Sequence, residues 1–337
     1  WDHYKDGMFV LGDEEKDKEV FALRPMTCPF QYQAYLNRKR SYRDLPLRYN
    51  ETSTLFRNEA SGEMHGLIRV RQFTISEGHL MCTPEQLEDE FRKCLELAIF
   101  MLKTLGLYED VSYRFSQWDP NDRAKYIGTE EQWNEAQGLM ERILNHLEIP
   151  YEIGIGEAAF YGPKLDIQIK NVYGKEDTLI TIQIDQMLAE QFGMVYTDKD
   201  GKQKTPCIIH RTSIGCYERT LALLIEKYAG AFPLWLAPVQ VKLLPIADRH
   251  LDYLYEVKKQ LEDKGFRCEV DDRSEKIGYK IREAQLEKVP YMVVVGDKDI
   301  ENNTISIRKR KEGDLGAMTV EQFLEKIVPD RDNKVID

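Results

Sequence analysis

The chain has 337 residues, of which 42% are hydrophobic and 31% charged, with a formal net charge of −11 at pH 7. This length predicts two or three domains, each with its own core, and the composition, the lack of long apolar runs and the absence of a secretory signal pattern argue against a membrane or secreted protein. The acidic surplus disfavours indiscriminate nucleic-acid binding, although a local basic patch such as 308–311 can still contact RNA or be a solvated strand end.

The first predicted element is a hairpin that joins residues 55–59 to residues 69–73 through a loop at 60–66. Because side chains alternate between the faces of a strand, its charged and aromatic residues should gather on shared faces. Arginines for phosphate, a carboxylate for an exocyclic amine and a ring for a base suit a nucleotide pocket, and a salt-bridged hairpin is the alternative. The residues concerned are Arg57, Glu59, Arg69, Arg71 and Phe73.

Two helices are predicted next from their start signals. Residues 83–86 supply a threonine N-cap, a proline and a capping-box glutamine, and apolar residues follow at helical spacing over 87–102. Residues 129–132 carry a similar signal before a second apolar stripe over 133–147. Both helices are expected to face a core.

Strands return after the second helix. Residues 165–170 and 180–185 alternate between apolar and polar types, which predicts antiparallel strands with one polar, working face. Residues 215–227 are predicted to form a helix that buries Leu221, Leu224 and Ile225.

The segment 229–238 is the predicted domain boundary, and we place the division between domains 1–235 and 236–337. Beyond it, strands and helices alternate, which favours a small α/β domain with a mainly parallel sheet. The predicted strands span 239–244, 266–270, 291–295 and 304–307, and the predicted helices span 251–264, 275–288 and a stretch after Thr319. The six cysteines form no close-spaced pairs, which argues against a disulfide framework and for a reducing, cytoplasmic environment.

Several separated stretches resemble the class II aminoacyl-tRNA synthetases, and the threonyl-tRNA synthetase family most closely. Residues 57–59 and 65–73 resemble the second signature motif, and 210–219 the third, with further matches at 26–29, at 160–164 and in the C-terminal region. The resemblance implies an α+β fold, in which an antiparallel-sheet class II catalytic domain precedes a C-terminal α/β anticodon-binding domain.

This resemblance implies an ATP-dependent ligase that forms threonyl-adenylate and transfers threonine to the 3′ end of tRNA(Thr). Such a site must neutralise charge on phosphoryl oxygens, with Mg²⁺ accompanying ATP. The implied catalytic residues are Arg57, Arg219 and Lys164; the implied ATP-binding residues are Arg57, Glu59, Arg69, Phe73, Gln183 and Arg219; the implied substrate-binding residues are Tyr161, Lys164, Gln183, Asp185 and Glu77.

Cys28, His79 and His210 match the three zinc ligands of this family, with one Zn²⁺ per subunit. Their spacing alone does not reveal a site, since isolated cysteines and histidines usually belong to the core. One thiolate and two imidazoles leave zinc coordinatively open, and in the family the amino group and hydroxyl of threonine complete the coordination. Valine should therefore be rejected strongly and serine weakly. Ile75, Glu77 and Cys216 depart from residues common among relatives.

In the C-terminal domain, Arg308, Asp299 and Lys288 match positions that contact the anticodon in the family. Unstacked anticodon bases are read by their edges, which suits arginine and carboxylate side chains. The family also implies a homodimer through the catalytic domain. The first class II motif and the N-terminal domains of threonyl enzymes are expected upstream of Trp1, so we expect a fragment of a longer protein or a reduced paralogue.

Two alternatives stay open at this point. One is a noncatalytic, synthetase-like RNA-binding regulator, which would have no need of Arg57, Glu59, Arg69 and Arg219 together with three metal-ligand candidates. The other is a related class II ligase for serine or proline. A metal site at Cys28 argues against proline, because the prolyl enzymes generally lack it.

Overall fold

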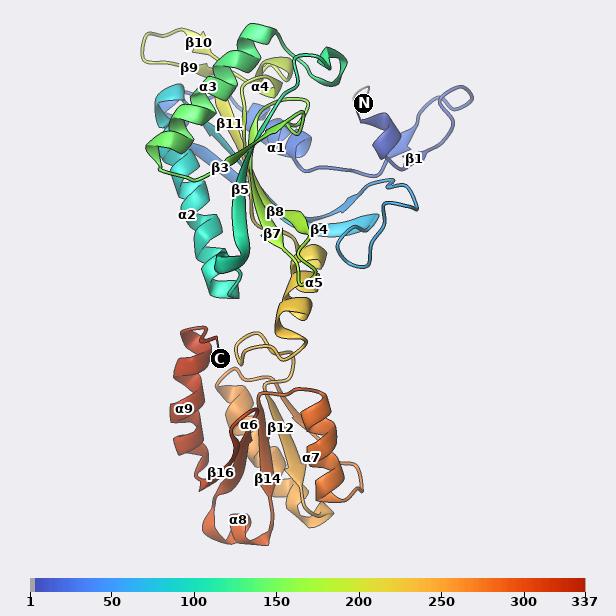
Figure 1. The fold of residues 1–337 in the computed structure, drawn as a ribbon, viewed down its shortest axis with the longest axis vertical. Helices are drawn as coiled ribbons and strands as arrows, with labels where there is room; N and C mark the ends of the chain where they lie inside the picture. The colour runs from blue at the N-terminus through green and yellow to red at the C-terminus, as the bar shows by residue number, and fades with distance from the viewer. Residues whose placement is uncertain (1–3, 337) are drawn as a thin grey trace. The chain divides into compact units, whose positions relative to one another are not determined.

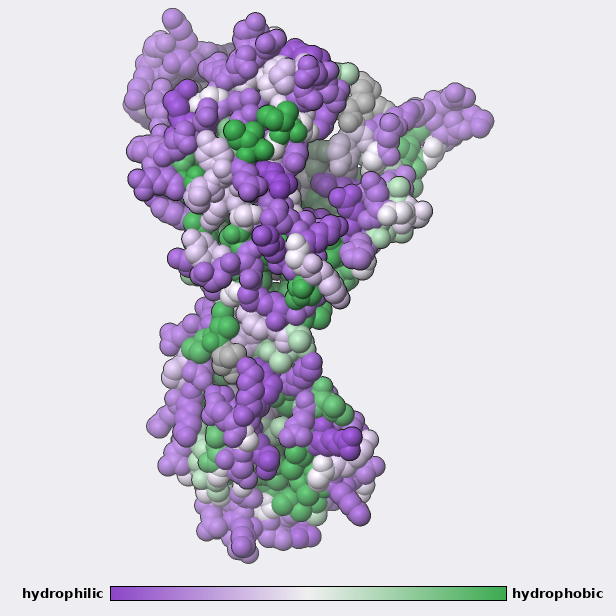
Figure 2. Space-filling model, viewed as in Figure 1, coloured by the Kyte–Doolittle hydropathy of each residue, from purple (hydrophilic) through white to green (hydrophobic). Residues whose placement is uncertain are grey.

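The computed structural model describes residues 4–336, and its chain divides into two compact units between Leu223 and Leu224. Figure 1 shows a sheet with helices packed beside it in each unit. The face visible in Figure 2 is mostly hydrophilic over both units, since the large apolar side chains are gathered in buried clusters. Among the helices of the described residues, none combines the length and the apolar character needed to cross a bilayer.

The first unit is built on a seven-stranded sheet with the order β3-β4-β11-β8-β7-β5-β6. Every neighbouring pair is antiparallel except β5 with β6, which confirms the predicted antiparallel catalytic-type sheet. The strands are β3 (Leu47–Phe56), β4 (Gln72–Cys82), β5 (Val111–Gln117), β6 (Glu152–Ile155), β7 (Lys164–Lys170), β8 (Glu176–Asp185) and β11 (Cys207–Cys216).

The two predicted core helices are confirmed as α2 (Leu87–Leu105) and α3 (Glu130–His146). Their predicted caps form, because the Thr83 backbone N–H donates to Gln86 Oε1 at 3.0 Å and that of Thr129 to Gln132 Oε1 at 2.9 Å. The remaining elements of this unit are β1 (Val10–Leu11), β2 (Phe21–Ala22), α1 (Cys28–Leu36), α4 (Leu188–Gln191), β9 (Tyr196–Thr197), β10 (Gln203–Lys204) and the start of α5 (Tyr217–Tyr228), with 3-10 turns at Lys5–Gly7, Tyr42–Asp44, Pro84–Gln86, Tyr108–Asp110 and Arg123–Lys125.

Alternation along the central strands gives the sheet two different faces. On β8, Ile180, Ile182 and Ile184 are fully buried on one side, while Gln183 and Asp185 lie on the other. The apolar face packs against α2, which contacts β4, β8 and β11. Part of the polar face lies under α1, where buried polar groups pair with one another.

The hairpin differs from its prediction in extent. β3 ends at Phe56 and β4 begins at Gln72, so residues 57–71 form one long connection instead of a loop at 60–66. Regular pairing stops soon after Arg57, whose N–H donates to the Arg71 carbonyl at 2.9 Å. The reason is that residues 58–71 are largely polar and exposed, with no continuous apolar face to hold them against the sheet.

The burial predicted for α5 is partly wrong. Leu224 is buried, but Leu221 and Ile225 are 47% and 42% exposed, and Leu223 is buried instead. The inward stripe runs through Thr220, Leu223 and Leu224 at the three- and four-residue spacing of a helix face. Leu221 and Ile225 lie beside that stripe, because the helix turns by about 100° per residue.

The second unit contains a five-stranded sheet with the order β13-β12-β14-β15-β16. β12 pairs in parallel with β13 and β14, whereas β14–β15 and β15–β16 are antiparallel, so the sheet is mixed rather than mainly parallel. The connections after β14 are too short for crossovers, which forces antiparallel pairing. The strands are β12 (Val241–Pro245), β13 (Cys268–Val270), β14 (Tyr291–Val295), β15 (Ile305–Lys309) and β16 (Gly313–Met318).

Helices cover both faces of this second sheet. α6 and α9 bury one side with Val241, Leu243 and Val293, and α7 covers part of the other side. The prediction missed β16 and the short α8, while the other elements are confirmed. The helices are α6 (Leu251–Asp263), α7 (Ile277–Leu286), α8 (Asp297–Asn302) and α9 (Val320–Asp332), and a 3-10 turn spans Asp248–His250. The division at 235/236 stays a prediction.

Candidate active site

Cys28, His79 and His210 come from three elements and meet in one buried cluster. Their ligand atoms all lie within 4.8 Å of one another. Cys28 opens α1, and the two histidines are directly opposed partners on β4 and β11. The tertiary structure therefore brings together three residues that the sequence separates by as many as 182 positions, and zinc at this place stays a prediction.

Each of the two histidines has one ring nitrogen that faces the other histidine and one that contacts a side-chain oxygen. His79 Nδ1 lies 2.9 Å from Gln31 Oε1, and His210 Nε2 lies 3.0 Å from Asp185 Oδ2. In the tautomers that donate to these oxygens, the outer nitrogens carry the protons, and the lone pairs of His79 Nε2 and His210 Nδ1 face each other 2.9 Å apart. A metal ion next to Cys28 could accept both lone pairs, so the cluster fits a metal ion.

Burial shifts the pKa values of two of the three groups, His79 and Cys28. It lowers the pKa of His79 well below its usual value, with His210 as the next cause, so this imidazole is a neutral ligand. It raises the pKa of the Cys28 thiol, and the carboxylates of Glu77 and Asp185 add to this while Arg57 opposes it. The donor set of one sulfur and two imidazoles suits Zn²⁺ and leaves coordination positions open.

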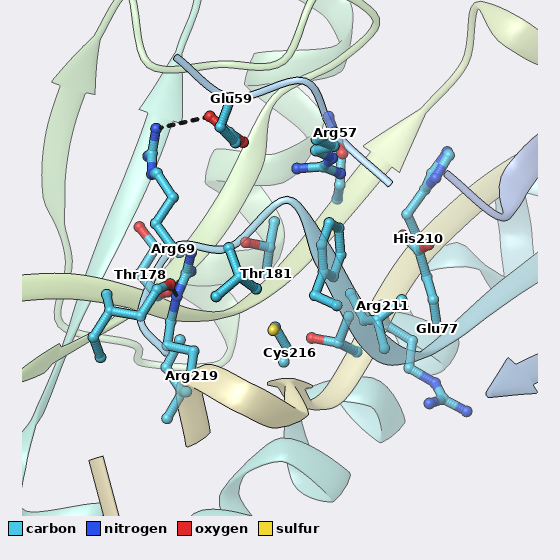
Figure 3. A pocket seen from close by; sticks show the side chains of 18 residues that line it. Arg57, Glu59, Arg69, Glu77, Thr178, Thr181, His210, Arg211, Cys216 and Arg219 are labelled. Carbon is cyan, nitrogen blue, oxygen red and sulfur yellow. Dashed lines mark hydrogen bonds and ion pairs between the residues drawn. The ribbon is translucent and has the colours of Figure 1, made fainter. Parts of the chain in front are cut away.

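A cavity of about 260 Å³ adjoins this cluster on the polar face of the sheet. Figure 3 shows Arg57, Glu59 and Arg69 on the connection between β3 and β4 and Arg219 on α5, all around the cavity. All six predicted ATP-binding residues thus line one space, together with one of the three predicted metal ligands, His210. The predicted site residues among its lining are Arg57, Glu59, Arg69, Phe73, Glu77, Gln183, His210 and Arg219.

The arginines of the cavity are held by backbone oxygens and an aromatic ring. Arg219 donates from Nε to the Ile68 carbonyl at 3.0 Å and from Nη1 to the Thr178 carbonyl at 2.6 Å, and burial lowers the pKa of its guanidinium. The Arg57 guanidinium lies 5.1 Å from the centre of the Phe73 ring. These contacts fix the positive groups before any phosphate arrives, which limits the reorganisation needed on binding.

Arg69 and Glu59 form the ion pair drawn as a dashed line in Figure 3, at 3.5 Å. Phe73 is covered by Arg57, so a stack of a base between Phe73 and Arg219 stays a prediction. Glu77 Oε2 accepts from Thr27 Oγ1 at 2.5 Å, next to Cys28.

A second cavity, of about 630 Å³, lies against the other side of the cluster. It shares Arg57, Ile75 and Glu77 with the first and adds Cys28 and Tyr161. Burial raises the pKa of Tyr161, so its hydroxyl keeps its proton, and its ring centre lies 5.0 Å from that of His210. The Cys28–His79–His210 cluster therefore borders the first cavity through His210 and the second through Cys28.

Two of the predicted substrate-binding residues line neither cavity. Lys164 donates to Asp166 Oδ2 at 2.5 Å, in a buried network beside the first cavity. Asp185 is fully buried, and besides His210 its carboxylate accepts from the backbone N–H groups of Met187 and Leu188 at 2.8 and 2.9 Å. The geometry makes Asp185 an orienting partner of His210, a candidate metal ligand.

Gly215 makes the turn that carries β11 into α5. Its φ is +73°, and a Cβ there would lie 2.0 Å from the Leu179 carbonyl oxygen, so only glycine fits. This turn places Arg219 beside Ile68. Sequence reasoning did not identify Gln31 as a partner of the cluster, although its position one helical turn after Cys28 was an available signal.

The three predicted anticodon residues lie in the second unit. Arg308 and Ser306 share a face of β15, and the carboxylate of Asp299 accepts from Ser306 Oγ and from the Gly296 N–H, both at 2.9 Å. Lys288 lies at the end of α7 and donates to the Ala229 carbonyl. Arg308 and the basic residues after it line a cavity of about 320 Å³. Asp299 is 9% exposed, so its carboxylate is largely committed to capping α8.

Two family profiles match the chain. That of the tRNA synthetase class II core domain (G, H, P, S and T) matches residues 9–228, and that of an anticodon binding domain matches residues 240–329.

Similar proteins agree with these profiles. A threonine–tRNA ligase of Clostridium perfringens is 65% identical over 97% of this chain and 51% of its own length, and one of Geobacillus kaustophilus is 45% identical over 98% and 50%. The chain thus spans about half the length of the curated relatives that it matches. A crystal structure described as the RNA binding domain of threonyl-tRNA synthetase from Cryptosporidium parvum is 33% identical, with a TM-score of 0.88 over 97% of this chain and 80% of that chain.

Proposed function

Because this chain belongs to the class II tRNA synthetase core family, among the threonyl-tRNA synthetases, we propose that it activates threonine with ATP and transfers it to the 3′ end of tRNA(Thr). The observation that carries the proposal is the open Cys28–His79–His210 cluster beside a cavity lined with fixed arginines. A metal that binds an amino acid and cations that bind a triphosphate are thus adjacent.

In this proposal, Cys28, His79 and His210 hold Zn²⁺, which when bound supplies a Lewis acid for the amino group and the hydroxyl of threonine. Gln31 and Asp185 orient the two imidazoles. Tyr161, Glu77 and Gln183 shape the space next to the metal, and Lys164 supports that wall through Asp166.

The nucleotide is held by the arginines of the first cavity. Arg57, Arg69 and Arg219 neutralise phosphoryl oxygens, with Mg²⁺ accompanying ATP. Glu59 accepts from the adenine amine, and the Phe73 ring and the Arg219 guanidinium supply flat surfaces for the base. The carboxylate of threonine then meets the α-phosphate near Arg57, which lines both cavities.

The remaining parts of the proposal concern partners. We assign Arg308, Asp299 and Lys288 to contacts with the anticodon of tRNA(Thr), and the basic groups after Arg308 support that assignment. A homodimer through the catalytic domain and a cytoplasmic location belong to the same proposal.

The alternatives gain no support from the site. A noncatalytic RNA-binding regulator has no use for Arg219 anchored at 3.0 and 2.6 Å beside a metal cluster. Proline, as a substrate, has no side-chain hydroxyl that could occupy the open coordination positions of the metal. The serine ligase alternative is tested directly by comparing pyrophosphate exchange with threonine and with serine.

Threonine-dependent exchange of pyrophosphate into ATP, with zinc content measured in the same samples, tests the proposal. Zinc-replete protein should exchange with threonine, more weakly with serine and not with valine. Cys28→Ala should lose both metal and exchange, whereas Cys268→Ala in the second unit serves as a matched cysteine control. Exchange that is absent in zinc-replete protein, or that survives the loss of zinc, would contradict the proposal.

A further inference from the structure

Thr212 places an unpartnered, buried hydroxyl in the first cavity. The residue is 7% exposed and lines the cavity, and its Oγ1 has no hydrogen-bond partner within residues 4–336. Ser53 and Tyr126 of the same unit also carry a buried polar atom without a partner, but they line neither cavity. A buried hydroxyl without a partner destabilises the folded protein, so its place on a cavity wall points to a ligand that supplies the partner.

The position of Thr212 is midway between the two halves of the proposed site. It lies two residues after the metal-ligand candidate His210, so both side chains project from the same face of β11, roughly 7 Å apart along the strand. The regular register of β11 with β4 ends at Thr212, and a bulge leads to Gly215 and then to α5, which carries Arg219. Thr212 therefore separates the metal side of the cavity from its nucleotide side.

The neighbours of Thr212 on β4 offer no neutral hydrogen-bond donor, while Thr181 and Gln183 on β8 donate to Asp166 and to the Gly162 carbonyl. Its partner across the ladder is Glu77, which accepts but cannot donate when it is ionised. Ile75, the next cavity-lining residue along β4, has no polar side-chain atom. A threonine hydroxyl can rotate its proton toward an oxyanion, which neither neighbour can do.

We propose that Thr212 contacts the junction at which the amino acid and the nucleotide become joined, and donates a hydrogen bond to an oxygen of the aminoacyl-adenylate as it forms. This inference rests on the proposed function. In that step a carboxylate oxygen of the amino acid forms a bond to the α-phosphorus, the bond from that phosphorus to the bridging oxygen breaks, and pyrophosphate leaves with the electron pair. Thr212 keeps its proton throughout and is a substrate-contacting residue for the intermediate.

Thr212→Val removes the hydroxyl and keeps the shape, while Thr212→Ser keeps the hydroxyl. In threonine-dependent pyrophosphate exchange, Thr212→Val should lower kcat by roughly ten- to hundredfold and change KM for threonine and ATP by less than about threefold, as for a group that acts after both substrates bind. Thr212→Ser should stay within about threefold of the wild type in kcat. Unchanged kcat in Thr212→Val, or a rise confined to KM for threonine, would overturn the assignment.

Thermal unfolding of the ligand-free protein separates this role from a structural one. Thr212→Val should have a Tm equal to or above that of the wild type, because the variant removes an unpaired polar group. Thr220→Val is the matched control, since Thr220 is buried and its hydroxyl donates to the Ile214 carbonyl at 2.5 Å, so its Tm should fall. A lower Tm together with lower kcat in Thr212→Val would make Thr212 structural and overturn the proposal.

Binding of a sulfamoyl analogue of threonyl-adenylate, measured by calorimetry on the zinc-replete chain, decides the matter without catalysis. Thr212→Val should weaken binding by roughly tenfold or more, and Thr212→Ser should not. If the wild type binds the analogue but shows no exchange, the proposed function fails while the comparison of Kd values still decides the role of Thr212. Equal Kd values in wild type and Thr212→Val, or no binding to the wild type, overturn the inference.

Discussion

Single residues determine the hydrogen bonds of the Cys28–His79–His210 cluster. Gln31 and Asp185 contact neither cavity, yet they fix which nitrogen of each histidine carries a proton. The sequence, through its family resemblance, predicted Asp185 as a substrate contact, whereas the structure gives its carboxylate to His210 and to two backbone N–H groups. Asp185 ends β8 on the polar face, next to β11, so its carboxylate reaches His210; a substrate contact of Asp185 stays a prediction.

Asp185→Asn should weaken zinc binding by about ten- to a hundredfold, because the amide no longer offers a charged acceptor to His210 Nε2 while its oxygen can still accept from the backbone. Competition with a chromogenic chelator measures the zinc affinity. Glu190→Gln is the matched control, because Glu190 is an exposed residue of α4. Equal zinc affinity in Asp185→Asn and the wild type would remove the orienting role.

Zinc affinity should rise with pH. Burial raises the pKa of the Cys28 thiol, so the metal-free protein holds that proton at neutral pH, and binding must release it. His79, whose pKa is lowered, releases none. Because the free state binds one proton more than the bound state, affinity should increase by about tenfold per pH unit between pH 6.5 and 8.5. A flat affinity over this range, in titrations with a pH-corrected competitor, would contradict a thiol that is protonated before metal binding.

At the scale of elements, the turn between β11 and α5 joins the metal side of the site to its nucleotide side. β11 supplies His210 and Thr212, and α5 supplies Arg219, so the angle of this turn sets the distance between the two halves. The angle depends on Gly215, which combines a positive φ with close approach to Leu179. The predicted helix start at residue 215 was wrong by two residues for this reason.

Gly215→Ala should be strongly destabilising and should abolish exchange, because its Cβ would lie 2.0 Å from a backbone oxygen that cannot move away alone. Gly174→Ala is the matched control: its φ is +78°, but no atom lies within 4 Å of its added Cβ, so it should cost only about 1 kcal/mol. Urea unfolding measures the free energy of unfolding of both variants. Similar losses of stability in the two variants would show that backbone conformation alone, and not packing against β8, requires glycine at residue 215.

At the scale of the whole molecule, each unit has its own core. Leu234 belongs to the core of the second unit, and the Gln240 amide donates to its carbonyl at 2.8 Å. Arg267 and Arg310 donate to the carbonyls of Trp235 and Phe232 at 3.0 and 2.7 Å. The segment before the predicted division at 235/236 is therefore tied to the second unit, although its composition resembles a linker.

A fragment of residues 224–337 should unfold cooperatively and should be more stable than a fragment of residues 236–337 by about 2–5 kcal/mol, the cost of losing a buried leucine and its hydrogen-bonded neighbours. Urea unfolding followed by circular dichroism measures this difference. Fragment 224–337 with Leu234→Ala should lose most of this difference in the free energy of unfolding. Equal stability of the two fragments would place the boundary at 235/236 after all.

The sequence by itself determined the elements and the family to which the site belongs. Start signals and periodicity gave α2, α3 and the strands β7, β8 and β12 to β15, because caps and apolar spacing are local properties of the chain. The resemblance identified Cys28, His79 and His210, yet no spacing rule could place them together, since contact between α1, β4 and β11 depends on strand order.

Only the tertiary structure decided which residues touch. It put Asp185 and Gln31 behind the two histidines, left Thr212 in a cavity without a partner among residues 4–336, exposed Leu221 and Ile225, and made the second sheet mixed. The physical reason is that register and packing between distant strands are set by the balance of the whole core, whereas a sequence pattern reports which side of an element is apolar and not what lies opposite it.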